Sequence, residues 1–530
     1  MILGNFIGFA RSSRGTDTFS SSNSLDGSLR PEIFCESTTI EVNAACELAY
    51  HAFEEFSQKS DDDRSKFLLR IADLLQIYRE KIGEIYCAES GLTKDRFEGE
   101  LFRTVRQLIN FSNEVKSSSW RNASIDTANV NQQPAKPDLR KMSVPLGPVV
   151  VFGASNFPLA YSTIGGDAAA ALAVGCPVIV KAHAFHAATS DLVATLVVQA
   201  AQETGMPDGV FSHLHARSFR VGQELVQHPC IKAVGFTGSH AGGRALFDLA
   251  NARKEPIPVF AEMGSVNPVF VFPEFLKDKS KKEKSAEMLA NSMISGMGQF
   301  CTNPGLIFVI ENENSADFIA LLSKAFLNKE TTSMLHVSIK ERFDQGKVKI
   351  ERQGVDLNHS VLAAGNHSVN RVNQALGVIK GCQFIQDSEL QEEVFGPFSM
   401  VIVCTDLDEM LACCKVLKGQ LTATIIALES ELKEQEKLLF QIENKVGRII
   451  FNGVPTGVDI SPSMHHGGPY PATTDSRFSA VGIDAIQRFL RPITYQNCPD
   501  ELLPAELQNR NAMRIHRRVN NVWTTDEVIF

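Results

Sequence analysis

Cys301 stands in a segment whose composition suits a reactive thiol. Residues 296–305 read GMGQFCTNPG, and these glycines and this proline favour an irregular turn over a regular helix or strand. A thiol on such a turn can be exposed and directed at a substrate, as covalent catalysis by cysteine requires. The chain has 11 cysteines, however, and a cysteine taken alone is more often an inert apolar residue. Cys301 therefore needs support from other residues.

That support comes from polar residues at the ends of short apolar runs. Glu262, Asn156 and Lys181 each stand at or just after the end of such a run, and the pair Gly238-Ser239 follows another one. Because the carboxyl ends of parallel strands meet at one edge of a sheet, these residues are predicted to face a common crevice. A carboxylate there could be a general base, an amide could donate to an oxyanion, and a lysine could hold ribose or phosphate oxygens. Taken singly, each is more simply a structural strand-end residue.

The segment around Gly238-Ser239 suits a phosphate. Residues 236–243 read FTGSHAGG, which offers a strand end followed by a helix start, and such a junction presents backbone N–H groups to an anion. The GxGxxG fingerprint and the P-loop are both absent, so a standard Rossmann turn and a nucleotide triphosphatase are disfavoured. His465-His466 precede Gly467-Gly468, but no third ligand has suitable spacing, so we predict a loop there and no metal site.

Hydrophobic periodicity predicts the elements that position these residues. Residues 41–115 have the pattern of helices packed outside a sheet. From residue 148, strand-like runs alternate with helical stretches, which indicates βαβ units and a parallel sheet, and a second α/β alternation continues to about residue 455. The predicted strands are 149–152, 178–181, 210–213, 233–237 and 257–261, and the predicted helices are 164–174, 191–204 with Ser190 as N-cap, 221–227, 243–251 and 285–295.

The totals favour a large globular enzyme. A chain of 530 residues with 44% hydrophobic residues can form more than one core, and its formal net charge of -9 gives no sign of a surface that binds nucleic acid. Scattered cysteines suit reduced thiols in a cytoplasmic protein. Prolines interrupt the long apolar stretch before Lys181, which excludes a membrane span. We also predict an edge strand at 1–10, a solvated lysine-rich loop at 277–284 and a polar, partly disordered end at 510–530.

The chain carries, in this order, the motifs ASNFP at 154–158, FTGS at 236–239, EMG at 262–264, GQFC at 298–301 and EVFGP at 393–397. Together these five motifs resemble the aldehyde dehydrogenase superfamily over roughly residues 1–505. The resemblance implies that Cys301 is the nucleophile, Asn156 the oxyanion donor and Glu262 the base. A thiohemiacetal on Cys301 would become a thioester, which water activated by Glu262 would hydrolyse to the acid without a metal.

The resemblance also implies where the cofactor and the domains lie. Lys181, Gly238 and Ser239 would contact the adenine-side ribose and phosphates, and Glu393 and Phe395 would position the nicotinamide ribose and ring. The implied fold has two parallel-sheet α/β domains and a small β-rich oligomerisation arm, which predicts a homodimer or homotetramer because unpaired strand edges favour a partner. The implied ranges are 1–123 and 146–262 for the cofactor-binding domain, 263–477 for the catalytic domain, 124–145 and 478–505 for the arm and 506–530 for a tail.

Two departures from the superfamily pattern bear on the cofactor and the base. Many NAD-dependent relatives carry a glutamate three residues after the strand-end lysine, where it binds the 2′-hydroxyl and repels a 2′-phosphate; this chain has Ala184 there. NADP is therefore predicted, with NAD possible, and His183, Arg217 and Arg220 are candidate phosphate partners, although a solvated surface explains the arginines equally well. Ser265 replaces the second glycine after the glutamate, which should leave the base usable.

Within the superfamily the chain most resembles the dehydrogenases of 2-oxoglutarate semialdehyde (2,5-dioxopentanoate). A neighbouring branch accepts medium- and long-chain aliphatic aldehydes, and a cysteine esterase without redox chemistry is an alternative of another class. Arg477 is one candidate for binding a second carboxylate, with a structural salt bridge as its simpler interpretation. The supporting segments are VVFGASN at 150–156, KAH at 181–183, FNGVPTGV at 451–458 and HGGPYPAT at 466–473.

Overall fold

The first α/β unit is built on a seven-stranded sheet with the order β12-β11-β8-β9-β10-β2-β3. The computed structural model describes residues 2–360 and 368–529. Runs of Val, Ile and Phe form the centre of the sheet because it is covered on both faces. The parallel strands are β8 (Val149–Phe152), β9 (Val178–Lys181), β10 (Phe211–Leu214), β11 (Ala233–Thr237) and β12 (Val259–Glu262), and β2 (Asn5–Ile7) and β3 (Ala10–Ser12) form an antiparallel edge.

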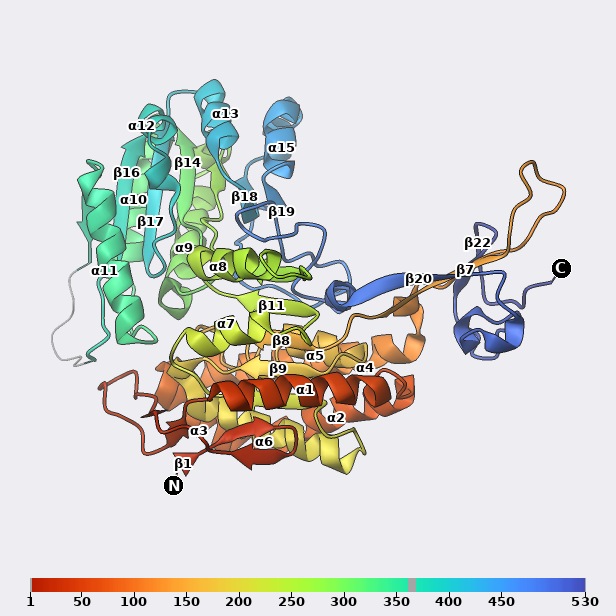
Figure 1. Ribbon diagram of the computed structural model, residues 1–530. Coiled ribbons are helices and arrows are strands. Elements are labelled where there is room, and N and C mark those ends of the chain that lie inside the picture. Colours follow the sequence, from red (N-terminus) through yellow and green to blue (C-terminus); the bar gives the residue numbers. More distant parts are fainter. Residues whose placement is uncertain (1, 361–367, 530) are drawn as a thin grey trace.

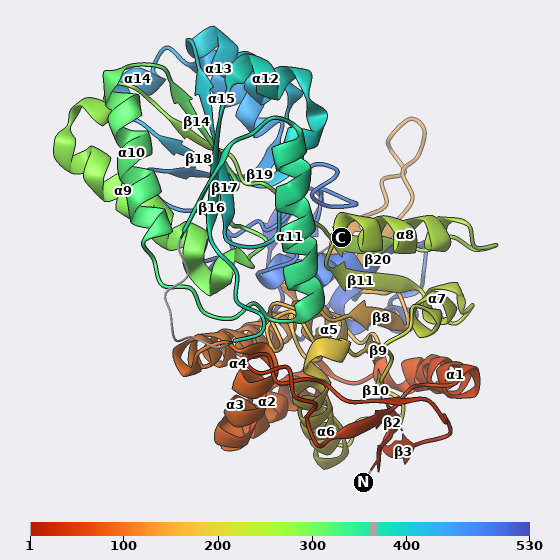
Figure 2. The same ribbon diagram turned by 90° about the vertical axis from the view of Figure 1, so that its left-hand side faces the viewer.

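Helices cover both faces of this sheet. Alternate residues of β8 point to opposite faces, so Val149 and Val151 pack with α2 to α6, while Val150 and Phe152 pack with α1, α7 and α8. Figure 2 shows α1 and α6 on opposite sides of the strands. The helices are α1 (Thr39–Phe56), α2 (Asp61–Ile77), α3 (Arg79–Ser90), α4 (Lys94–Ser117), α5 (Gly166–Ala173), α6 (Ala187–Glu203), α7 (Arg220–Gln227) and α8 (His240–Asn251).

The predicted N-cap of α6 is wrong. Ser190 lies inside the helix, buried, with its hydroxyl 2.7 Å from His213 Nε2. The first turn is capped from another helix instead, because the Glu89 carboxylate of α3 accepts from the backbone N–H groups of Ala188 and Thr189, each at 2.8 Å. A carboxylate at a helix N-terminus satisfies the same orphan donors as a local cap, so the helix begins before its apparent cap residue.

The second α/β unit has a seven-stranded sheet of order β15-β16-β17-β14-β13-β18-β19, parallel except for β15. Its strands are β13 (Val269–Val271), β14 (Leu306–Ile310), β15 (Leu357–His359), β16 (Ala375–Lys380), β17 (Phe398–Cys404), β18 (Gln420–Ile426) and β19 (Val446–Phe451). Its helices are α9 (Lys279–Ile294), α10 (Glu313–Leu327), α11 (Val337–Arg352), α12 (Gly381–Gln386), α13 (Leu407–Val416), α14 (Glu429–Leu432) and α15 (Glu436–Glu443).

The lysine-rich segment 277–284 is not the predicted loop. Most of it forms the start of α9, where the Asp278 side chain caps the helix by accepting from the N–H of Lys281 at 3.1 Å. Lys282 is nearly buried and contacts Asp317 of α10 at 3.0 Å. A clear N-cap and an ion pair to the next helix therefore allow the charged run to be helical.

A five-stranded sheet of order β20-β7-β6-β21-β22 forms an arm that projects from the two α/β units (Figure 1). Its strands are β6 (Ser124–Asp126), β7 (Leu139–Pro145), β20 (Leu490–Gln496), β21 (Arg517–Val519) and β22 (Val522–Thr524). A three-stranded sheet contains β1 (Ile2–Leu3), β4 (Thr18–Phe19) and β5 (Ile33–Cys35). Short 3-10 helices span Ser119–Arg121, Ala184–His186, Phe275–Lys277, Ser295–Gly298, Ser388–Gln391, Ile483–Phe489, Asp500–Leu502 and Ala505–Leu507.

Residues 510–529 are ordered, contrary to the prediction of a partly disordered end at 510–530. Asn520 and Asn521 both have positive φ, +47° and +68°, and close a tight hairpin between β21 and β22. The Arg517 side chain is fully buried and donates to the carbonyl oxygen of Asn509 at 2.8 Å. The polar composition did not predict this structure, because the segment has no apolar face. It is stabilised instead by the buried Arg517 guanidinium and by the pairing of β21 with β6.

The architecture confirms the predicted fold class of two parallel-sheet α/β units with a β-rich arm. Among the described residues, no helix is long and apolar enough to cross a lipid bilayer.

Candidate active site

Glu262 lies where the first sheet meets the second α/β unit. It is the last residue of β12 and is 3% exposed. It forms a bridge with Thr473 of the late loop, which spans residues 452–482 after β19. Its carbonyl oxygen accepts from the N–H of Gly238 at 3.0 Å, so the Glu262 backbone is tied to the strand end of β11. The carboxyl ends of adjacent strands are thus brought together as the sequence predicted.

Cys301 follows the short helix Ser295–Gly298 on an irregular turn. Gly296, Met297 and Gly298 have φ of +55°, +58° and +65°, a conformation that favours glycine. At Gly298 a Cβ atom would lie 2.2 Å from the carbonyl oxygen of Gly396, so the close approach of these two backbones also requires glycine. The turn therefore depends on the glycines that marked it in the sequence.

Asn267 fixes the backbone of this turn from the second unit. Its side-chain Nδ2 donates to the carbonyl oxygens of Cys301 at 2.8 Å and Asn303 at 2.9 Å. The Ser265 hydroxyl lies 3.0 Å from Asn267 Oδ1 and 2.9 Å from Gln420 Oε1. The serine that replaces a family glycine is therefore part of the polar network that holds the Cys301 turn.

His466 joins the cysteine to the glutamate. Its Nε2 lies 3.6 Å from Cys301 Sγ and 3.0 Å from Glu262 Oε1, and both His466 and Glu262 are buried. Glu262 Oε2 has no hydrogen-bond partner among the described residues. Both contacts are made by the same ring nitrogen, which can accept the thiol proton only when it carries none, and which can then donate that proton to the Glu262 carboxylate in a hydrogen bond.

The electrostatics of the cluster determine which of its groups holds a proton. Burial, followed by the charge of Glu262, raises the pKa of the Cys301 thiol well above its usual value. Burial also raises the pKa of Glu262, but the contacts with His466 and Cys301 outweigh it, so the pKa of this carboxyl falls below its ordinary value. At neutral pH Cys301 is therefore a thiol and Glu262 a carboxylate.

Sequence reasoning missed His466. The pair His465-His466 is predicted from the sequence to have a loop role, because no further ligand stands at suitable spacing. The fold brings His466 to Glu262 and Cys301, which are far away in the chain. One imidazole nitrogen, one carboxylate oxygen and the thiol sulfur of these residues lie within 4.8 Å of one another. The only local signal is a histidine beside two glycines in a turn-rich segment, which is too weak to indicate a partner.

Asn156 also lies against the Cys301 turn. It follows β8, and its Nδ2 donates to the carbonyl oxygen of Gln299 at 2.9 Å. The rings of Phe157 and Phe300 meet edge to face with their centroids 5.4 Å apart. The loop after β8 and the cysteine turn are therefore in direct contact, which brings Asn156 to the same cluster.

The predicted adenine-side residues lie at the ends of β9 and β11. Lys181 ends β9 and has no ion-pair partner among the described residues, and burial lowers the pKa of Lys181 to about 8 despite the opposing charge of Glu36. Ser239 is the N-cap of α8, accepting from the N–H of Gly242 at 3.3 Å, so the expected helix start behind Gly238 is present. A cation and a helix N-terminus at one sheet edge suit a phosphate.

The other phosphate candidates differ in what they can offer. Burial, together with the nearby charge of His186, lowers the pKa of His183 well below its usual value, so this side chain is a neutral hydrogen-bonding group. Arg220 donates to the carbonyl oxygen of Ser37 at 2.5 Å and pairs with Glu224, and Arg217 is exposed. Arg220 therefore has a structural role in this conformation.

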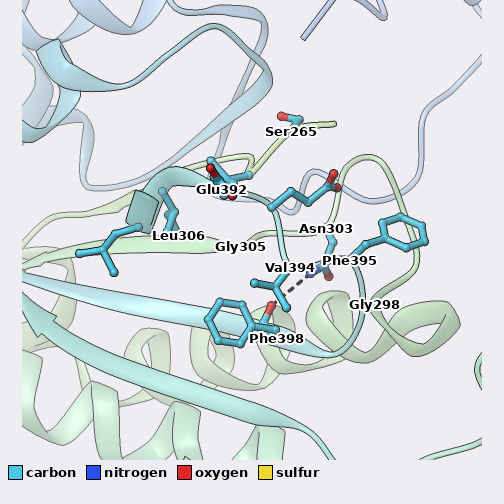
Figure 3. Close-up of a pocket in the computed structure, with 12 residues that line it drawn as sticks. Ser265, Gly298, Asn303, Gly305, Leu306, Glu392, Val394, Phe395 and Phe398 are labelled. Atoms are coloured by element: carbon cyan, nitrogen blue, oxygen red, sulfur yellow. Dashed lines mark hydrogen bonds between the residues drawn. The ribbon is translucent and has the colours of Figure 1, made fainter. Parts of the chain in front are cut away.

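Glu393 and Phe395 line a pocket beside the cysteine turn (Figure 3). Gly298, Asn303 and Ser265 contribute to the same pocket. Burial raises the pKa of Glu393 to about 8, partly offset by the N–H of Ser265. A Cβ atom at position 264 would lie 2.2 Å from Glu393 Oε2, so a larger residue there would displace the Glu393 carboxyl from its present position.

Arg477 does not occupy a position suited to a substrate carboxylate. Its side chain is 79% exposed and forms an ion pair with Asp475 at 2.5 Å. The structural salt bridge is the correct interpretation of this residue.

A turn that carries a thiol beside a buried histidine and glutamate, held by two parallel-sheet units, belongs to the class of sites suited to covalent catalysis by cysteine, and the comparisons identify the family. The chain belongs to the aldehyde dehydrogenase family, whose model matches residues 32–490. It is 42% identical over 528 residues to the alpha-ketoglutaric semialdehyde dehydrogenase of Acinetobacter baylyi, covering 98% of both chains. It is 43% identical over 489 residues to alpha-ketoglutaric semialdehyde dehydrogenase 2 of Azospirillum brasilense, covering 92% of both.

Solved structures show the same fold at low identity. A 1-pyrroline-5-carboxylate dehydrogenase from Thermus with bound NAD matches with a TM-score of 0.77 and 20% identity, covering 93% of this chain and 92% of that one. A 3,6-anhydro-L-galactose dehydrogenase in complex with NAP matches with a TM-score of 0.80 and 18% identity, covering 94% and 100%. The family resemblance predicted from the five motifs is confirmed.

Proposed function

We propose that the protein oxidises 2-oxoglutarate semialdehyde to 2-oxoglutarate with NADP. The observation that carries the chemistry is the Cys301–His466–Glu262 cluster, with distances of 3.6 Å and 3.0 Å, beside the pocket of Glu393 and Phe395. The names of the two relatives at 42% and 43% identity support the substrate. A family member with an intact nucleophile and base is suited to catalysis rather than to a binding role alone.

The first half of the reaction forms a covalent bond to the substrate. His466 accepts the proton of the Cys301 thiol, Glu262 stabilises the imidazolium, and the sulfur adds to the aldehyde carbon to give a thiohemiacetal. The oxyanion is held by the Asn156 amide and the backbone N–H of Cys301. When bound, NADP supplies the hydride acceptor that turns this adduct into a thioester.

The second half of the reaction releases the acid. The free Oε2 of Glu262 accepts a proton from a water molecule, which attacks the thioester carbon. The bond between that carbon and Cys301 Sγ breaks, the carboxylic acid leaves, and the sulfur takes up a proton. The chain's own residues perform this step, so the proposed mechanism needs no metal.

The residues present fit a phosphorylated dinucleotide. Lys181, Gly238 and Ser239 would hold the adenine-side ribose and phosphates, and Glu393 and Phe395 would hold the nicotinamide ribose and ring. Lys181 offers a cation without an ion-pair partner in the described part of the chain, and position 184 is an alanine, so no carboxylate stands three residues after it to repel a 2′-phosphate. His183 adds a neutral hydrogen-bonding group. These features support NADP over NAD.

The β-rich arm is the reason to include oligomerisation in the proposal. β20 and β22 are the edge strands of its sheet, and an exposed sheet edge favours pairing with another chain. We infer a homodimer or homotetramer with the cofactor-binding and catalytic segments implied by the family, and with an arm that also contains β21 and β22 from the segment 506–530.

A panel of aldehydes assayed with both cofactors tests the proposal. We expect wild-type enzyme to form NADPH from 2,5-dioxopentanoate and NADP with a kcat/KM at least about tenfold above that for NADH formation from NAD, because one favourable charge contact is worth about this factor. Decanal should be a poorer substrate than 2,5-dioxopentanoate. Preference for decanal would favour a medium- or long-chain aldehyde dehydrogenase, and ester hydrolysis without any aldehyde-dependent reduction would favour the esterase.

The variant His466→Gln tests the proton acceptor. We expect alkylation of Cys301 by iodoacetamide at pH 7 to slow by about 100-fold, because a general base typically contributes 100- to 10,000-fold and glutamine cannot accept the thiol proton. In both proteins alkylation should accelerate as pH rises toward the raised pKa of the thiol. Mass spectrometry of the peptide that contains Cys301 measures the rate, and His465→Gln is the control. Equal rates in wild type and His466→Gln would contradict the assignment.

A further inference from the structure

Two half-buried arginines approach the active site with no carboxylate partner in the described part of the chain. Arg103 of α4 donates to Tyr161 Oη at 3.1 Å and to the carbonyl oxygen of Val458. Arg448 of β19 donates to the carbonyl oxygen of Pro455 at 2.5 Å and contacts Met464 Sδ at 3.8 Å. Among the described residues, neither guanidinium forms an ion pair with an acidic side chain.

Contacts link both arginines to the cysteine cluster. The Tyr161 ring that Arg103 contacts lies 6.4 Å from the His466 ring, centroid to centroid. Met464, which Arg448 contacts, stands two residues before His466 in the same loop. The positive charge of Arg103 acts on Cys301, where it opposes the rise in the pKa of the thiol that burial and Glu262 cause.

The hydrogen bonding of the two arginines is incomplete. Arg448 Nε is buried and has no partner among the described residues, and burial lowers the pKa of Arg448 while the nearby Cys301 and Tyr161 oppose that change. Carbonyl, hydroxyl and thioether groups are neutral, so they leave the cationic charge uncompensated. A charge taken out of water is costly unless an opposite charge accompanies it, and a guanidinium is well matched to a carboxylate.

We propose that Arg103 and Arg448 together bind the carboxylate of the aldehyde substrate and so select oxo-carboxylates over uncharged aldehydes. This inference rests on the proposed function. In 2,5-dioxopentanoate the carboxylate carbon is four carbon–carbon bonds from the aldehyde carbon. When the aldehyde carbon is bonded to Cys301 Sγ, the carboxylate must therefore lie close to the residues that surround Cys301. The rings of Phe157, Tyr161 and Phe300 contact one another edge to face beside the Cys301 turn and offer an apolar surface for the aliphatic part of the substrate.

A purely structural role is the competing explanation. Both arginines hold carbonyl oxygens of one loop, at Pro455 and Val458, and could simply anchor it. Glutamine keeps N–H donors for such carbonyls but lacks the charge. The variants Arg103→Gln and Arg448→Gln therefore separate anchoring from carboxylate binding. Arg106→Gln is the matched control, because Arg106 lies on the same helix, is exposed and already pairs with Asp459 at 3.3 Å.

The test compares kcat/KM for 2,5-dioxopentanoate and pentanal, which have the same number of carbon atoms. We expect each of the two glutamine variants to lose about 10- to 100-fold with 2,5-dioxopentanoate, the value of a charge-assisted hydrogen-bonded contact, and to lose at least about tenfold less with pentanal. Arg106→Gln should differ from wild type by less than about twofold with both. Calorimetric titration of the cofactor-free enzyme with 2-oxoglutarate should show weakened binding in the same two variants.

The outcomes separate this inference from the proposed function. Equal losses with both aldehydes, or no loss in either variant, would overturn the carboxylate assignment while leaving an aldehyde dehydrogenase. Wild-type enzyme that oxidises pentanal but not 2,5-dioxopentanoate would overturn the proposed substrate and the carboxylate assignment together. Wild-type enzyme that reduces neither cofactor with any aldehyde would overturn the proposed function itself.

Discussion

Replacing Cys301 by alanine should abolish aldehyde-dependent formation of NADPH, lowering kcat by roughly 10,000-fold or more. The reason is that the sulfur forms the covalent bond on which both halves of the proposed reaction depend, and loss of a nucleophile commonly removes most of an enzyme's rate enhancement. Stopped-flow absorbance with 2,5-dioxopentanoate and NADP measures the rate. The variant should still bind NADP, which fluorescence titration can confirm.

Cys382→Ala is the matched control for this prediction. Cys382 is an exposed cysteine on α12, away from the cluster of Glu262 and His466, so its loss should change kcat by less than about twofold. If Cys301→Ala retained more than about a tenth of the wild-type rate, the reaction could not pass through a Cys301 thioester, and the proposed mechanism would have to be abandoned.

Much of the scaffold could be predicted because its signals are local. The strands at 149–152, 178–181 and 233–237 match β8, β9 and β11, since each is a short apolar run buried on a two-sided sheet. The helix start behind Gly238-Ser239 was equally visible, because a serine cap and a strand end lie side by side in the sequence. Glu262 and Asn156 followed from the same rule about the carboxyl ends of parallel strands.

The features that were missed depend on contacts between distant segments. Glu89 caps α6 from another helix, so the local signal at Ser190 misled the prediction. Arg517 orders the end of the chain through backbone carbonyls, which leave no pattern of apolar residues. His466 reaches Cys301 only because the late loop returns to the end of β12. Hydrophobic periodicity describes which face of an element is buried, and it carries no information about which polar group that face meets.

In the proposed mechanism, the unpaired Oε2 of Glu262 allows one carboxylate to serve both halves of the reaction. Oε1 contacts His466 and would stabilise the charge that forms there when the thiol loses its proton. Oε2 is left without a partner among the described residues and can bind water. The contacts with His466 and Cys301 lower the pKa of Glu262 despite its burial, so the group is ionised and able to act as a base at neutral pH.

Glu262→Gln should therefore stall the enzyme after acylation. We expect a pre-steady-state burst of about one NADPH per active site, slower than in wild type because glutamine does not stabilise a charged His466, and then turnover about 1,000-fold slower than wild type because glutamine cannot activate the hydrolytic water. Rapid-quench mass spectrometry should detect the acyl group on Cys301. Glu255→Gln is the control, because Glu255 is exposed and lies before the same strand. Its burst amplitude and its steady-state kcat should both equal those of wild type.

The pH dependence of the wild-type enzyme gives the same prediction a second readout. Deacylation needs ionised Glu262, so its rate should fall as pH drops through the pKa of this carboxyl, and the lowered pKa places that fall below the ordinary value for glutamate. The acidic limb should disappear in Glu262→Gln, which has no carboxyl to protonate. A variant that turns over without a burst and keeps the wild-type acidic limb would show that another group activates the water.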